Sequence, residues 1–497
     1  MTAEESNVTA PTDAAFAAVR RPLLLGIVAC LLAAAAAGAA FAFSSPLFSS
    51  ADESAHVDYA YQVWTGSLPE FHAGLVIRPG FGFIPPVQWV AQHPPLYYVI
   101  QAPVVGPLIE SGHYLMAGYA ARAFNALLAA FVVGAVAWAA AQAFPRRPQL
   151  WLAASLVAAM NSWVVRVGGS VYNDLLCALW ATLLLGITIR TLHRGATLRR
   201  CVLLTLTAAA AVATRASLGV VVVGCLAVLV IHTGLATKSW RSALGATGRY
   251  SLVGLAALVP SAWFYLRNLR LTGRLLGGDP AWAQEHLHRT LRSAADQVMD
   301  PQSWKALMSI FSYGVFDRDL MMGLLLVMPL VLAGMKLLLS RRNTARWWHV
   351  RLPARATFAL LAGVALAVVA MQFEYAAGGG GLIPRYTMPL VLVISLAVGY
   401  GLSELPGVGS LLLVSWAGLA LAEFVAWVAR QFSASPVAGT APVYPTAAWT
   451  AVAVCVAAIT IALACHEAVR RANRPPRESL SRSPGALRGT VPCPPDR

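Results

Sequence analysis

Charged residues are scarce in this sequence of 497 residues. Asp, Glu, Lys and Arg make up 12% of it, while hydrophobic residues make up 58%. Soluble globular domains are typically about 25% charged. Repeated apolar runs of about the length needed to cross a bilayer accompany this scarcity. The composition therefore argues against an ordinary soluble protein and predicts an all-α polytopic membrane protein.

Cysteine pairs and acidic residues are also in short supply. The seven cysteines lie mostly inside apolar runs, and none forms a Cys-x-x-Cys pair, so the pattern favours small buried hydrophobes over a zinc site or a disulfide framework. The 21 acidic residues against 37 basic ones give a formal net charge of +16. A nucleic-acid partner is one interpretation of that charge, but the positions of the basic residues favour membrane topology instead.

Apolar segments recur along the whole chain. The first follows Arg20 and Arg21, and it is longer than the roughly 7–15 residues of a signal-peptide core, which favours an uncleaved helix over a cleaved signal peptide. About twelve transmembrane helices are predicted at 23–43, 117–143, 149–165, 171–192, 200–214, 216–233, 251–267, 319–339, 355–373, 386–402, 409–428 and 447–465.

Lysine and arginine orient these segments. With the N-terminus inside, roughly two thirds of the 37 basic residues fall on the inner side, including the FPRRP and HRGATLRR stretches. An even number of spans returns the C-terminus to the same side. The pattern predicts a multi-pass protein of the bacterial inner (plasma) membrane with both termini cytoplasmic.

Five regions follow from this map. They are a cytoplasmic tail (1–22), a catalytic membrane module (23–267) that contains the external loop 44–116, a second external loop (268–318), the last transmembrane helices (319–466) and a disordered cytoplasmic tail (467–497). Loop 44–116 is rich in proline and aromatic residues, so we expect one or two helices in the membrane interface there. The alternative, a further span at 96–110, inverts every later segment and conflicts with the basic clusters.

A series of motifs accompanies this organisation. The first apolar segment leads into D-E-x-x-H-x-x-Y at Asp52, and the later motifs are G-x-L-P at Gly66, H-P-P-L-Y-Y at His93, A-R-x-x-N-A-L-L at Arg122, W-F-Y-L-R-N at Trp263 and P-R-Y-T-M-P at Pro384. This order resembles the GT-C superfamily of membrane glycosyltransferases. Protein O-mannosyltransferases and lipid A aminoarabinose transferases are members of it.

The resemblance implies a polyprenyl-phosphate sugar as donor and an acceptor hydroxyl at the external face. Asp52 matches the catalytic aspartate of the family, and a carboxylate at the membrane surface can remove the acceptor proton. Glu53 then binds the acceptor or orders Asp52. Cations must neutralise the phosphate leaving group, and the predicted ones are Arg122, which matches a family arginine, with Arg385, Arg267 and Arg215.

Further substrate contacts are expected from residues of the same predicted face. They are His56, Tyr59, His93, Tyr97, Asn173, Asp174 and Tyr386. His56 lies four residues after Asp52, so it shares a face with it on a helix and can orient it. No metal site is predicted firmly, although a divalent ion held by His56 and Asp52 is an alternative.

Structural roles compete with each of these assignments. Asp52 and Glu53 can cap an interfacial helix, and Asn173 with Asp174 can cap a span. His93 before two prolines suits a turn. Arg122 and Arg385 can instead extend to lipid headgroups.

Two other functions fit a polytopic chain. The first alternative is a transporter or a flippase of a glycoconjugate, but internal repeats are not evident and mid-span charges are few, Glu423 being the clearest. The second is a polymerase or ligase of surface polysaccharide. The expected partners are the lipid-linked donor, membrane lipid and an acceptor polysaccharide, lipid or protein, with no nucleic acid.

Overall fold

The computed structural model describes residues 13–288, 291–341, 351–405, 407–433 and 439–473. All regular elements in these ranges are helices, which confirms the all-α prediction for the described part of the chain. Helix α1 begins at Asp13 and α19 ends at Ala472, so residues 13–22 and 467–472 of the two predicted tails are helical. Residues 474–497 lie outside the described ranges.

Within the described ranges, ten helices are long and apolar enough to cross a membrane, or eleven if one bent pair counts as a span. They follow the apolar segments of the sequence. The ten spans are Val19–Ser44 in α1, Tyr114–Ala143 (α4), Asp174–Arg194 (α7), Ala216–Thr237 in η2 and α9, Trp240–Thr272 (α10), Arg318–Leu339 in α14, η3 and α15, Leu352–Ala377 (α16), Pro384–Ser403 in η5 and α17, Gly409–Ser433 (α18) and Pro445–Ala472 (α19).

Two predicted spans differ from this set. Segment 200–214 is helix α8 (Leu198–Thr214), and its 17 residues fall short of the roughly 20 that a spanning helix usually needs. Segment 149–165, predicted as a span, is not one continuous helix. It is the pair α5 (Pro148–Ala159) and α6 (Ser162–Gly168), bent by 56°. The bend occurs where the Asn161 side chain accepts from the N–H groups of Trp163 and Val164 and starts α6 anew.

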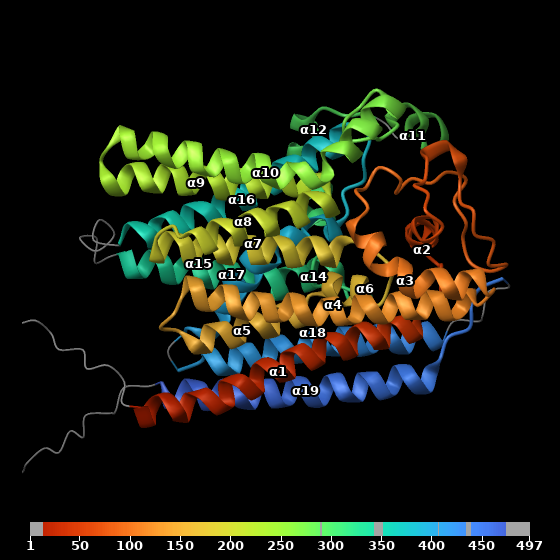
Figure 1. Cartoon of the computed structure of the whole chain (residues 1–497). Helices are drawn as coiled ribbons and strands as arrows, with labels where there is room; N and C mark the ends of the chain where they lie inside the picture. Colours follow the sequence, from red (N-terminus) through yellow and green to blue (C-terminus); the bar gives the residue numbers. More distant parts are fainter. Residues whose placement is uncertain (1–12, 289–290, 342–350, 406, 434–438, 474–497) are drawn as a thin grey trace, which may run out of the picture.

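The long helices run side by side, so the molecule has two distinct ends (Figure 1). We call one the α2 end, because it holds α2 (Ala51–Trp64) and α3 (Leu96–Glu110) together with the short helices α11 (Pro280–Leu287), α12 (Ala294–Met299) and α13 (Pro301–Met308). The opposite end holds the links α4–α5, α7–α8 and α9–α10. It also holds the start of α1 and the end of α19, which pack against each other.

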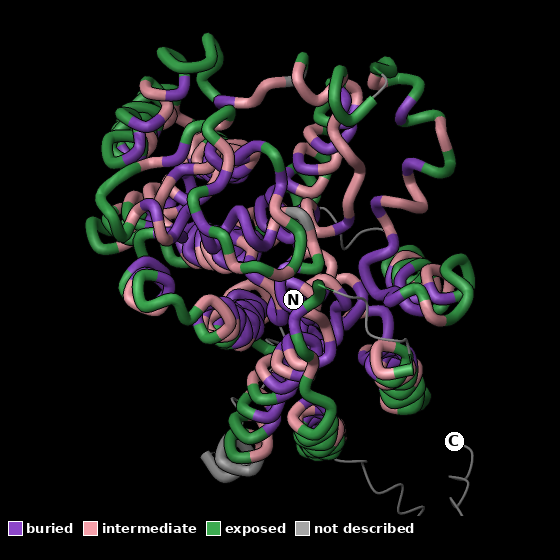
Figure 2. Tube along the Cα trace, turned by 90° about the vertical axis from the view of Figure 1, so that its right-hand side faces the viewer, coloured by how far each residue is buried: buried purple, intermediate pink, exposed green. Residues whose placement is uncertain are grey.

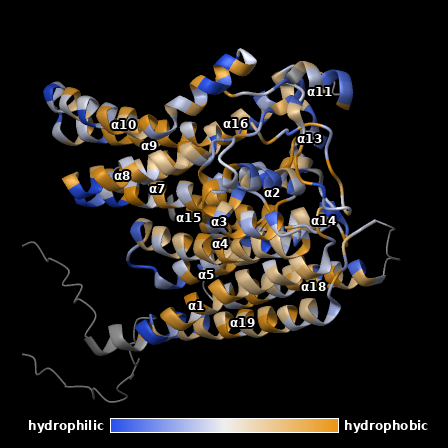
Figure 3. Cartoon of the chain, turned by 45° about the vertical axis from the view of Figure 1, so that its right-hand side comes forward, coloured by the Kyte–Doolittle hydropathy of each residue, from blue (hydrophilic) through white to orange (hydrophobic). Residues whose placement is uncertain are grey.

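Polar residues concentrate at the ends, and buried ones lie inside the bundle. The long helices are mainly hydrophobic along their length, whereas α2 is hydrophilic (Figure 3). Viewed towards the α2 end, buried segments occupy the centre and exposed ones the rim (Figure 2). Helix α3, with 15 residues, is not among the candidate spans, and it packs against α2 and α4. The predicted loop 44–116 therefore contains two helices of ordinary length beside the bundle.

Candidate functional site

Helix α2 brings two adjacent carboxylates to the mouth of the bundle. It begins after the extended residue Ser50, and Asp52 and Glu53 lie in its first turn, where the helix dipole favours negative charge. Glu53 is 1% exposed, whereas the Asp52 side chain keeps 24% of its exposure. The two carboxylates therefore have different environments and different partners.

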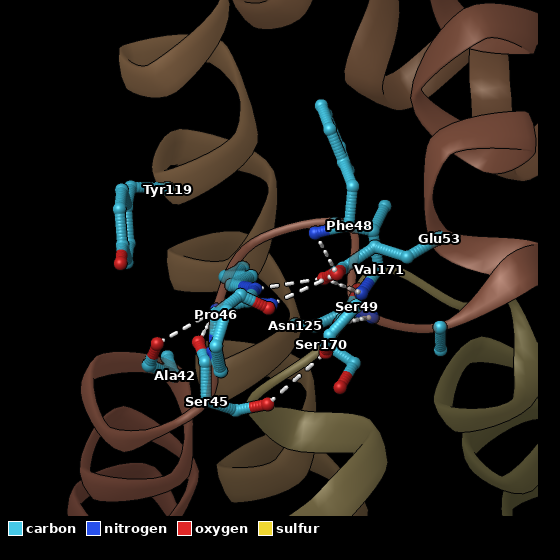
Figure 4. A network of polar contacts seen from close by, with 12 residues as sticks. Ala42, Ser45, Pro46, Phe48, Ser49, Glu53, Tyr119, Asn125, Ser170 and Val171 are labelled. Carbon is cyan, nitrogen blue, oxygen red and sulfur yellow. Dashed lines mark hydrogen bonds and ion pairs between the residues drawn. The ribbon is translucent and has the colours of Figure 1, made fainter. Parts of the chain in front are cut away.

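Glu53 forms a buried ion pair with Arg122 of α4 (Figure 4). The Arg122 Nε and one terminal nitrogen donate to the two carboxylate oxygens at 2.7 and 2.8 Å. The backbone N–H groups of Phe48 and Val171 donate to the same carboxylate at 2.8 and 3.1 Å. The other Arg122 N–H groups donate to three carbonyl oxygens at the end of α1 and just after it, at 2.7 Å for Ala42, 2.7 Å for Ser45 and 3.0 Å for Pro46.

This network engages all five N–H donors of the Arg122 guanidinium. A phosphate could bind Arg122 only by displacing one of these partners. The geometry therefore favours a structural role for Glu53 and Arg122 over the acceptor-binding and phosphate-binding roles predicted for them. Together they tie the start of α2 to α1, α4 and the link before α7.

Asp52 instead pairs with Arg385 of η5 (Pro384–Leu390), a residue far away in the sequence. The Arg385 guanidinium also lies 4.6 Å from the ring centre of Tyr172 and 5.1 Å from that of Tyr386. Its Nε is buried and has no hydrogen-bond partner among the described residues. Arg385 thus lies close to two aromatic rings, and its buried Nε–H is not engaged by the described residues.

A second ion pair shares this aromatic environment. Arg215, at the end of α8, pairs with Asp174 at the start of α7, and its guanidinium lies 5.0 Å from the Tyr386 ring centre. Tyr386 therefore lies between the two arginines. We call Asp52, Asp174, Arg215 and Arg385, with Tyr172 and Tyr386, the charged cluster.

Two histidines border the charged cluster. His56 Nδ1 lies 2.9 Å from the Tyr98 hydroxyl, and the His56 ring is 5.4 Å from that of Tyr172. Burial lowers the pKa of His56, and the charges of Arg385 and Arg215 lower it further. The second histidine is His93, and its ring lies 6.3 Å from that of His56.

The roles predicted for the histidines change in the structure. Burial and the charge of Arg215 lower the pKa of His93, while the charge of Asp52 acts in the opposite direction. The hydrogen bond of His56 is made with Tyr98 rather than with Asp52, the carboxylate that it was predicted to orient.

Other predicted substrate contacts are engaged in packing. The Tyr59 hydroxyl donates to the His93 carbonyl at 2.9 Å, and its ring stacks on Tyr98 with centroids 3.7 Å apart. The Tyr97 hydroxyl donates to Asn125 at 2.9 Å. Both tyrosines are fully buried. Their positions favour support of the site over direct contact with a substrate.

Asn173 and Arg267 lie at the edges of this arrangement. Asn173 donates to the Thr214 carbonyl at 3.4 Å, and its side-chain oxygen is buried without a partner among the described residues. Arg267 donates to the carbonyl oxygens of Leu68 and Pro69 at 3.3 and 3.0 Å. Arg267 thus holds the G-x-L-P loop, while Asn173 has an acceptor free beside Asp174.

Sequence reasoning missed three residues that shape the site. Tyr172, in the link before α7, forms part of the cluster. Asn125, three residues after Arg122 in the A-R-x-x-N motif, donates to the carbonyls of Ser170 and Tyr172 at 2.6 and 2.9 Å and fixes that link. Asp58, two residues after His56 on α2, orders the 65–95 loop. Of these three residues, Asn125 could have been found from the sequence, because it is the asparagine of the A-R-x-x-N motif.

Asp58 is fully buried and accepts four hydrogen bonds. The N–H groups of Val76 and Ile77 donate at 2.7 and 2.9 Å, and the side-chain amides of Gln62 and Gln88 donate at 2.7 Å each. Burial raises the pKa of Asp58, although these hydrogen bonds oppose the rise. This carboxylate therefore fastens the 65–95 loop to α2.

The described residues contain no group of three or more His, Cys, Asp or Glu side chains placed to hold a metal ion. The six cysteines of the described ranges are unpaired, and five of them are buried; Cys493 lies outside those ranges.

Comparisons with known proteins give fold likenesses and no family assignment. No family model matches the chain, and no curated protein matches it. ArnT from Cupriavidus metallidurans bound to undecaprenyl phosphate is similar in structure, with a TM-score of 0.44 and 15% identity over 93% of this chain and 79% of that chain. Its apo state has a TM-score of 0.45 and 16% identity over 92% of this chain and 78% of that chain. The archaeal oligosaccharyltransferase AglB from Archaeoglobus fulgidus, in complex with an inhibitory peptide and a dolichol-phosphate, has a TM-score of 0.45 and 12% identity over 90% of this chain and 56% of that chain.

Proposed function

We propose that this chain is a membrane glycosyltransferase that moves a sugar from a polyprenyl-phosphate donor to an acceptor hydroxyl at the α2 end. The observation that carries the proposal is the charged cluster. It combines two guanidinium groups, which suit a phosphate, with a carboxylate that remains partly exposed.

In the proposed reaction, the acceptor oxygen forms a bond to the anomeric carbon of the donor sugar. The bond between that carbon and the phosphate oxygen breaks, and the electron pair leaves with polyprenyl phosphate. Asp52 accepts the proton of the acceptor hydroxyl. Arg385 and Arg215 stabilise the negative charge that develops on the leaving phosphate.

The ion pair between Asp52 and Arg385 adds a requirement for donor binding. While Arg385 holds Asp52, the carboxylate is a weak base because its charge is stabilised. A phosphate bound by Arg385 competes for the same guanidinium and releases Asp52 towards the acceptor. The Arg385 Nε, buried and without a partner among the described residues, is a further donor for a phosphate that replaces Asp52. The base is thus freed when the donor is in place.

The membrane orientation belongs to the same proposal. The basic links of the opposite end lie in the cytoplasm, and the α2 end faces the outside of a bacterial inner membrane. The donor is then a carrier whose sugar phosphate reaches the outer surface. The acceptor is a polysaccharide, lipid or protein with a hydroxyl there.

A transporter or flippase is the second candidate, and the bent pair α5–α6 favours it, since broken helices line many transporter sites. In such sites the N-terminus of the half-helix points at the substrate. Here the first N–H groups of α6 donate to the Asn161 side chain at 2.9 and 3.2 Å. This terminus is already capped, so we favour the enzyme.

The test measures donor consumption by the purified full chain in nanodiscs, with a panel of undecaprenyl-phosphate sugars. Asp52→Asn should reduce turnover by roughly two to four orders of magnitude, the usual range for a general base, and should keep undecaprenyl phosphate binding because Arg385 remains. Asp317→Asn is the matched control, since Asp317 caps α14 at the same end and asparagine caps equally well. Near-normal turnover of Asp52→Asn would overturn the catalytic assignment.

A further inference from the structure

A groove lies between α8 and α10, towards the end of the bundle opposite the charged cluster. Its volume is about 590 Å³. The lining residues of α8 run from Leu198 to Leu206, which is about 12 Å at 1.5 Å per residue. That length fits within one leaflet, which is about half of a hydrocarbon core of roughly 30 Å.

The lining of this groove is apolar with one cation. Leu198, Val202 and Leu206 of α8 face Leu252 and Val253 of α10. Arg249 is the charged residue among the lining residues, and it is exposed. An apolar channel with a cation beside it suits an acyl chain attached to an anionic headgroup.

The position of the groove also fits a lipid. Helix α8 begins at the opposite end, beside the α7–α8 link, so the groove opens at the level where headgroups lie if the bundle spans a membrane. The spans formed by α9 and α10 are only 28% buried within the protein. Their remaining surface is therefore available to the surrounding membrane.

The stretch of chain around the groove is basic, which favours one charge type of headgroup. No acidic residue occurs between Asp174 and Asp279, whereas Arg194, Arg199 and Arg249 are all exposed there. A zwitterionic headgroup brings a cation into this field, while a net anionic one does not. The field therefore favours an anionic lipid over a zwitterionic one.

We infer that the α8–α10 groove is a binding site for an anionic glycerophospholipid, with one acyl chain along the groove and the phosphate at Arg249. The site is separate from the proposed transferase centre and does not depend on it. Its occupant fastens α10, which has a largely exposed surface, to the rest of the bundle.

Cys201 provides a direct probe, because it lines the groove and is the one partly exposed cysteine of the described residues. In a Cys493→Ser background, the labelling of Cys201 by N-ethylmaleimide is followed by mass spectrometry on the full chain in a neutral detergent. We expect phosphatidylglycerol to slow this labelling at least fivefold, and phosphatidylcholine at the same concentration to have little effect.

Two substitutions locate the effect. Arg249→Gln should abolish the protection by phosphatidylglycerol, whereas Arg241→Gln, at an exposed position of α10 outside the groove, should leave it intact. Leu206→Trp should fill the groove and prevent retention of phosphatidylglycerol in native mass spectrometry. Both Arg249 and Leu206 are exposed, so the variants should fold.

The alternatives have different outcomes. Equal protection by both phospholipids would show an apolar chain without headgroup selection and would overturn the proposal. Protection by undecaprenyl phosphate at lower concentration than phosphatidylglycerol would assign the groove to the carrier lipid. Unchanged labelling with every lipid would exclude lipid binding in the groove.

Discussion

Removal of the Arg122 side chain should destabilise the protein without a specific effect on donor binding. In Arg122→Ala the Glu53 carboxylate loses two charge-assisted hydrogen bonds of 2.7 and 2.8 Å and keeps only the N–H groups of Phe48 and Val171. Both members of the pair are 1% exposed. The carboxylate is therefore left buried and without its counter-ion.

The expected size follows from the burial of the pair. Breaking a buried ion pair by removing one partner costs about 3–5 kcal/mol. An unfolding entropy of about 2.1 cal/mol/K per residue gives roughly 1 kcal/mol/K for a chain of this size. The midpoint of thermal unfolding should then fall by about 3–5 °C.

The assay is thermal unfolding in detergent, paired with equilibrium binding of undecaprenyl phosphate at a temperature well below the midpoint. Arg122→Lys should lose less stability, since one ammonium replaces the charge but not the forked set of five donors. Arg385→Ala is the contrasting variant, and it should weaken binding. A normal midpoint for Arg122→Ala together with a loss of binding would refute this reasoning and restore Arg122 as a phosphate ligand.

Three further expectations concern the α2 end. Asp58→Asn places an amide donor against the donors of Gln62 and Gln88, so limited proteolysis should cut the 65–95 loop faster than in the exposed control Glu70→Gln. The pKa values of His56 and His93 are lowered in the folded protein, so below pH about 6.5 these histidines bind protons in the unfolded chain but not in the folded one. Thermal stability should therefore fall from pH 7.5 to pH 5. An unchanged midpoint of thermal unfolding would contradict the assignment of both as buried neutral histidines. In intact cells an impermeant thiol reagent should label Ser67→Cys and not Gly195→Cys, and the reverse would invert the topology.

The sequence could predict which charges share one end of the bundle. Arg215 and Arg385 adjoin the ends of predicted apolar segments, and Asp52 follows the end of the first one by nine residues. Alternating spans place such ends on the same side. The structure brings these three residues into one cluster, although Asp52 and Arg385 are 333 positions apart. The placement of these charges at one end of the bundle therefore follows from the hydropathy pattern and the number of spans between them.

The choice of partners could not be predicted in the same way. Neighbouring residues on a helix point about 100° apart, so Asp52 and Glu53 must face different elements. Which of them meets Arg122 depends on the rotation of α2 about its axis, and long-range hydrogen bonds to Val76, Ile77 and Val171 set that rotation. The bend at Asn161 also escaped prediction, because apolar residues continue on both sides of it.

The two carboxylates at the start of α2 therefore have complementary tasks in the proposed enzyme. A general base needs a fixed position and access to the acceptor, but burial fixes a side chain by removing access. Glu53 supplies the fixed position, because its buried pair with Arg122 ties the first turn of α2 to three other segments. Asp52 lies one residue earlier, so its position is fixed by the same anchoring of α2. It stays partly exposed, and its ion-pair partner among the described residues is Arg385. An ion pair at the rim can be exchanged for a bound phosphate, whereas a buried one with every donor engaged cannot, and this difference assigns anchoring to Glu53 and chemistry to Asp52.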